Sequence, residues 1–116
     1  MLTIQTLQAY GANTAEGLAR CMNNESFYLR LVGMALADGN FEKLRRAAEA
    51  RDAAGVFEAV HALKGAVGNV SLTPIYEPVC ALTEKLRGHT DAPFTDDEGL
   101  VDTILARLEE ARGLAE

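Results

Sequence analysis

The chain has 116 residues, of which 48% are apolar, and its 17 acidic and 11 basic residues give a formal net charge of −6. This length suits one domain over residues 1–116, and the apolar fraction predicts a packed core rather than a disordered chain. The acidic balance and the scattered basic residues argue against nucleic acid or an anionic membrane as a partner.

Cysteine and histidine are too few to indicate a metal centre. The two cysteines, Cys21 and Cys80, and the two histidines, His61 and His89, form no CxxC or HxxxH spacing, and we expect no metal site. The sequence does not decide whether these two cysteines form a disulfide. The first ten residues do not resemble a signal peptide, and no apolar run reaches the about 20 residues of a membrane span. We therefore expect a cytoplasmic protein.

The spacing of apolar residues is helical almost throughout the chain. Two short helices are predicted over residues 2–10 and 15–22, with Thr14 as the cap of the second. A longer helix is predicted over residues 25–38, and Asn24 is its cap. The residues expected to face the core are Leu18, Cys21 and Met22 in the second helix, and Phe27, Leu31, Met34 and Ala35 in the third.

Two further helices are predicted in the middle of the chain. Residues 38–40 indicate the end of one helix followed by the N-cap, Asn40, of the next, which is expected over residues 41–50. Asp52 then caps a helix that contains the sequence HALKGAVGNV at residues 61–70. The residues of the first of these helices that should face inward are Phe41, Leu44, Ala47 and Ala48.

The last two helices also carry start signals. Thr73 is the expected N-cap, and Pro74 the first residue, of a helix that ends at Gly88. After a loop over residues 89–94, residues 95–98 have the spacing of a capping box and are expected to open the final helix. Its predicted inward stripe is Val101, Ile104, Leu105, Leu108 and Ala111.

The sequence gives no sign of a β-sheet, because it has no alternating apolar pattern, hairpin dipeptide or internal repeat. Short loops between amphipathic helices favour antiparallel neighbours. The predicted fold is therefore all-α: an up-down antiparallel four-helix bundle with additional short N-terminal helices.

The helix that contains His61 has distinct faces, because successive residues turn by about 100°. His61 lies roughly 140° from the centre of the apolar sector and should point to solvent. Gly65 and Gly68 share this outer stripe, and Lys64 flanks it. Each glycine costs a helix about 1 kcal/mol relative to alanine, which indicates that another group approaches the backbone there. The sector expected to face the core is Val56, Val60, Leu63, Val67 and Val70, with Phe57 at its border.

An imidazole, an ammonium group and bare backbone together suit the carriage of a phosphoryl group. Neutral imidazole is nucleophilic near neutral pH, because its reference pKa is about 6.5. Lys64, one turn after His61, is placed to neutralise an anion on that ring. From spacing alone, an ordinary surface histidine and a glycine pair that serves helix packing remain alternatives.

The same residues resemble a known family. HALKGAVGNVSL is similar to the phosphoacceptor helix of histidine-containing phosphotransfer (HPt) domains, in which a lysine follows the histidine by three residues and a glycine by four. EGLARCMNNESFYLRLVGMAL resembles the paired helices upstream, and LTPIYEPVCALTEKLRG the helix downstream. The resemblance covers Thr14 to Gly88.

The resemblance implies a four-helix bundle without an ATP site. His61 would accept a phosphoryl group from the aspartyl phosphate of a receiver domain and pass it on. Lys64 would be the phosphate-charge neighbour, and Gly65 the residue that gives clearance, with Gly68 beside it. Many members orient the imidazole with a glutamine on the next helix, and here Thr83 stands near the comparable place as the possible orienting residue.

The resemblance also implies the partners, which are a response-regulator receiver domain and/or a hybrid sensor histidine kinase. It implies no cofactor on this chain, with Mg²⁺ on the receiver. We expect a monomeric histidine phosphocarrier in a two-component phosphorelay, not an enzyme by itself. One alternative is an HPt-like docking module that binds a kinase or receiver without carrying phosphate. Another is an enzyme with a histidine nucleophile or metal, for which Glu58 is the nearest candidate carboxylate.

Overall fold

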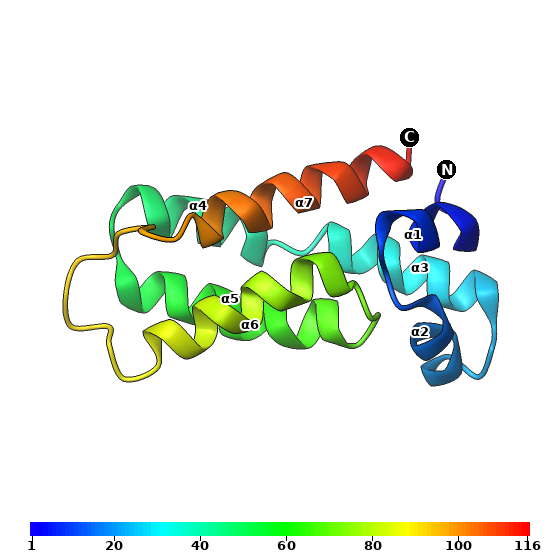
Figure 1. Cartoon of the computed structure of the whole chain (residues 1–116), viewed down its shortest axis with the longest axis horizontal. Helices are drawn as coiled ribbons and strands as arrows, with labels where there is room; N and C mark the ends of the chain where they lie inside the picture. Colours follow the sequence, from blue (N-terminus) through cyan, green and yellow to red (C-terminus); the bar gives the residue numbers. More distant parts are fainter.

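The computed structural model describes all 116 residues and contains seven α-helices and no β-strand (Figure 1). The helices are α1 (Ile4–Tyr10), α2 (Thr14–Arg20), α3 (Glu25–Leu36), α4 (Asn40–Glu49), α5 (Ala53–Gly68), α6 (Thr73–Leu86) and α7 (Leu100–Leu114). All seven predicted helices are present, and no further helix occurs.

Helices α4 to α7 form the bundle. In Figure 1 they lie along the horizontal axis and run in alternating directions, with α5 beside α4 and α6, and α7 along the side of α6. Helix α3 extends beyond α4 towards the end of the molecule that holds α1, α2 and both termini. This arrangement confirms the predicted all-α four-helix bundle with additional N-terminal helices.

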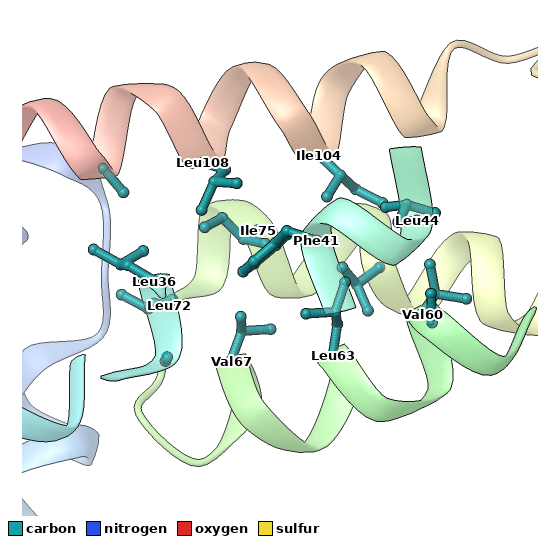
Figure 2. Packing of buried hydrophobic residues seen from close by; sticks show 14 of the residues in the cluster. Leu36, Phe41, Leu44, Val60, Leu63, Val67, Leu72, Ile75, Ile104 and Leu108 are labelled. Atoms are coloured by element: carbon teal, nitrogen blue, oxygen red, sulfur yellow. The ribbon is translucent and has the colours of Figure 1, made fainter. Parts of the chain in front are cut away.

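The core is one cluster of 27 buried hydrophobic residues, to which all four bundle helices contribute. Burial of a leucine or valine side chain contributes roughly 1.5–3 kcal/mol, so this cluster is the main source of stability. The side chains that meet in Figure 2 include Phe41 and Leu44 of α4, Val60, Leu63 and Val67 of α5, Ile75 of α6, and Ile104 and Leu108 of α7.

The buried face of α3 differs from the predicted one. Phe27 and Met34 are 39% and 64% exposed, and Leu31 is only partly buried. Met22, predicted to face inward after α2, is 84% exposed. The residues of α3 that are buried are Tyr28, Val32, Ala35 and Leu36, so Ala35 was correctly predicted, and Leu31 packs against the core from a half-buried position.

Tyr28 explains this rotation of α3. Its side chain is fully buried, and its hydroxyl donates a hydrogen bond of 2.9 Å to the backbone carbonyl of Val70. Its ring covers Gly17 of α2 so closely that a Cβ atom there would lie 2.4 Å from the ring. A buried hydroxyl needs a partner, so this contact sets which face of α3 turns inward.

Some N-caps are the predicted residues, and others differ from the prediction. Asn24 and Asp52 cap α3 and α5 through their side chains, as predicted. Three caps lie one residue earlier than predicted, a difference with little structural consequence. The N-cap is Asn13 rather than Thr14 for α2, Gly39 rather than Asn40 for α4, and Leu72 rather than Thr73 for α6.

The capping box predicted at residues 95–98 does not open α7, which begins at Leu100. Instead, the carboxylate of Asp96 accepts hydrogen bonds from the backbone N–H groups of Val101 and Asp102 at 3.1 and 3.2 Å. The carboxylate therefore satisfies two of the unpaired donors at the start of the helix from a position outside it.

Two glycines in helix interiors provide a matched test of the Tyr28 packing. Gly17→Ala should lower the free energy of unfolding by about 1–3 kcal/mol, because the added methyl group would overlap the fully buried ring of Tyr28. Gly33→Ala should raise it by up to about 1 kcal/mol, because no atom lies within 4 Å of the new Cβ. Urea denaturation measures both, and equal effects would contradict this packing.

Candidate functional site

Helix α5 buries one face in the core and exposes the other. Val56, Val60, Leu63 and Val67 have no accessible surface, and Val70, just after the helix, is 3% exposed, so the predicted core sector is correct. His61 is exposed on the opposite side. The apolar stripe thus determines the direction in which the histidine points.

His61 borders a groove on the surface of the bundle, to which α2 and α6 also contribute walls. The groove brings together His61, Lys64, Gly65 and Gly68, which are four of the five residues selected from the sequence, and it leaves out Thr83. The other residues that shape it include Glu16 and Arg20 of α2 and Tyr76 of α6.

The two glycines in the groove have different surroundings. A Cβ atom at Gly65 would have no other atom within 4 Å, so the backbone there is open to an outside group. A Cβ atom at Gly68 would lie 2.8 Å from the ring of Tyr76. Gly68 therefore makes room for a side chain of its own chain, which corrects the expectation that it clears space for a partner.

Thr83 does not orient the imidazole of His61. Its side chain is fully buried, and its hydroxyl donates a 2.7 Å hydrogen bond to the carbonyl of Val79, one turn earlier on α6. A threonine inside a helix readily bonds the carbonyl four residues before it, and this local contact has taken the hydroxyl donor.

The imidazole of His61 instead lies against an aromatic ring of its own helix. The centroids of the His61 and Phe57 rings are 5.9 Å apart and the ring planes differ by 9°. No hydrogen bond within the protein reaches the imidazole. Sequence reasoning placed Phe57 only at the border of the core, although its position four residues before His61 was a usable signal, because such pairs are neighbours on a helix.

Lys64 is the cation in the groove that has no carboxylate partner. It takes part in none of the six ion pairs of the structure. Arg20, by contrast, pairs with Glu16 at 3.5 Å and donates a 3.1 Å hydrogen bond to the carbonyl of Gly68. An anion that enters the groove beside His61 would therefore meet Lys64 as an available ammonium group.

Arg20 and Tyr76 are groove residues that the sequence did not reveal. Both come from other helices, and only the packing of α2 and α6 around α5 brings them there. A side-chain hydrogen bond with Cys80 raises the pKa of Tyr76 above its ordinary value of 10.0, and a phenol is already protonated at neutral pH without that shift. The groove therefore offers a neutral hydroxyl as well as two cations.

Other parts of the chain add no metal-type cluster. No group of three or more His, Cys, Asp and Glu side chains is gathered so that it could hold a metal ion. Cys21 and Cys80 are both free thiols in the structure. None of the helices combines the length and apolarity required to cross a membrane.

The comparisons with known proteins point to one family. A family model described as Hpt domain matches residues 34–113. The match includes α4 to α6, and therefore His61, and all of α7 but its last residue, so it extends beyond Gly88, where the resemblance seen in the sequence ends. Residues 14–33, which also looked similar, lie outside it. Searches of curated proteins and of solved structures gave no match.

Proposed function

The chain belongs to the Hpt domain family, and on that premise we propose that His61 carries a phosphoryl group in a two-component phosphorelay. Domains of this family are phosphocarriers rather than catalytic enzymes, and they work with receiver domains and kinases. We infer that the partner of this chain is a response-regulator receiver domain and/or a hybrid sensor histidine kinase. The observation that carries the proposal is the exposed His61 beside Lys64 and Gly65 within the matched region.

The proposed reaction is an in-line displacement. The unprotonated ring nitrogen of His61 attacks the phosphorus of the receiver's aspartyl phosphate, a P–N bond forms, and the bond between phosphorus and the aspartate oxygen breaks. The aspartate leaves as a carboxylate, and Mg²⁺ would come with the receiver. Such transfer depends mainly on position and on neutralisation of charge, so a carrier needs few groups of its own.

Lys64 and Gly65 meet these two needs in the proposal. The ammonium group of Lys64 stabilises the negative charge on the phosphoryl oxygens. The open backbone at Gly65 lets the receiver approach until the reacting atoms are about 3–3.5 Å apart, the separation that transfer requires. The reverse step returns the phosphoryl group to a second aspartate by the same geometry.

Two other functions fit the chain less well. A docking module that never carries phosphate would not need an exposed histidine with an unpaired lysine and an open glycine beside it, and this chain has all three. An enzyme that acts by itself would need further catalytic groups around the His61 nucleophile, yet no hydrogen bond joins Glu58 or any other carboxylate to His61.

The proposal is tested first with His61→Gln. The side chain is exposed, so the free energy of unfolding should stay within about 0.5 kcal/mol of the wild type. The wild-type protein should gain acid-labile phosphate from a phosphorylated receiver domain, and the variant, which keeps only His89, should gain none. Undiminished labelling of the variant contradicts the proposal. A wild-type protein that binds a receiver but takes no label supports the docking module instead.

A second test uses opposite effects at Gly65. Gly65→Leu should raise the free energy of unfolding by up to about 0.8 kcal/mol, because leucine is the better helix former and the site is open. It should also slow transfer from a receiver about a hundredfold, the loss expected when the reacting atoms are misplaced by about 1 Å. Labelling by the small donor phosphoramidate should persist.

Gly65→Ala is the control and should transfer at a rate nearer that of the wild type. If Gly65 served helix packing, Gly65→Leu would unfold more easily, and its loss of transfer from a receiver would follow from that unfolding. Thermal denaturation together with the two labelling assays distinguishes these outcomes.

A further inference from the structure

An exposed histidine has a freely rotating ring unless something restrains it. In a helix, two χ1 wells are open to such a side chain, and χ2 has two broad orientations. A transfer reaction uses one ring nitrogen aimed at the phosphorus, so a free ring would spend about a quarter of its time in the useful orientation. A restraint on the His61 ring would raise that share, and Thr83 does not supply one.

Phe57 is in contact with this ring and has the right geometry to restrain it. The two rings are parallel within 9°, and their centroid distance of 5.9 Å falls in the range of offset-stacked aromatic pairs. Phe57 itself is partly buried and packs against the hydrophobic core, so it is a fixed surface rather than a second mobile ring.

Arg87, at the end of α6, secures Phe57 from another helix. Its guanidinium carbon lies 5.8 Å from the centroid of the Phe57 ring, a distance at which a cation is attracted to the aromatic face. The guanidinium also pairs with the carboxylate of Glu84 at 3.1 Å. The end of α6 thus reaches the histidine through Phe57.

We propose that Phe57 is the positioning residue for His61, and that Arg87 holds Phe57 in place. The stacked ring holds χ1 of His61 in one well and fixes the plane of the imidazole, so that the ring edge with its nitrogens faces the incoming phosphorus. The inference rests on the proposed function, because the positioned ring is the phosphoacceptor. Stacking leaves both nitrogens free of hydrogen bonds, so the partner meets a nucleophile that no protein donor has engaged.

The test compares Phe57→Leu with Phe57→Tyr. Leucine keeps an apolar side chain on the core but has no ring plane, whereas tyrosine keeps the plane. Phe57→Leu should shift the His61 ring-proton resonances, through loss of the ring current, and should let χ1 of His61 average over two wells. Its transfer from a receiver should fall about twofold, because one of the two χ1 wells is unproductive. Phe57→Tyr should keep resonances close to those of the wild type, a single χ1 well and the wild-type rate.

Two further variants keep the test valid if Phe57→Leu unfolds. Arg87→Met removes the cation from an exposed position and should shift the His61 resonances in the same direction, but less. Thr83→Val, the matched control on α6, should leave them unchanged. Unchanged His61 resonances and a single χ1 well in both Phe57→Leu and Arg87→Met would overturn the positioning role.

The failure of the two proposals can be distinguished. A wild-type protein that takes no phosphate from phosphoramidate or a receiver would overturn the proposed function, and with it the positioning role. Normal wild-type transfer with no effect of Phe57→Leu would overturn the positioning role alone. The resonances of His61 in the unphosphorylated protein report the stacking directly in either case.

Discussion

The rotational position of α5 is the constraint on which the rest of the structure depends. Four residues of its inner face have no accessible surface, and each contributes roughly 1.5–3 kcal/mol through burial. A turn of the helix about its axis would expose them and bury the ammonium group of Lys64, which is costly without a partner. Burial of the inner face therefore keeps His61, Lys64 and Gly65 on the outer side of the helix. The four inner residues are Val56, Val60, Leu63 and Val67.

The two glycines of α5 show how packing and function share one helix. The ring of Tyr76 fills the space beside Gly68 as part of the helix packing, whereas Gly65 faces open space. Both weaken the intrinsic helix propensity, but most helical stability in proteins comes from the packing of an apolar face. The helix can therefore carry a glycine beside the histidine, because its opposite face is fully buried.

The sequence predicted the features that depend on local spacing. The inner face of α5, the exposure of His61 and the caps Asn24 and Asp52 follow from helical period and side-chain chemistry. The errors arose where a contact with a residue distant in the sequence decides which face of a helix is buried. The hydroxyl of Tyr28 turns α3 by bonding to Val70, and nothing near Tyr28 in the sequence announces that partner. The groove residues from α2 and α6 were missed for the same reason.

The most direct test of this account locates the phosphate in the wild-type protein. The chain has two histidines, and His89 lies exposed in the loop before α7, so it is an internal control. The protein is phosphorylated by a receiver aspartyl phosphate, digested at neutral or higher pH and examined by tandem mass spectrometry. The account predicts phosphohistidine at His61 and none at His89. Phosphate at His89, or none on either histidine after the protein has bound a phosphorylated receiver, would contradict it.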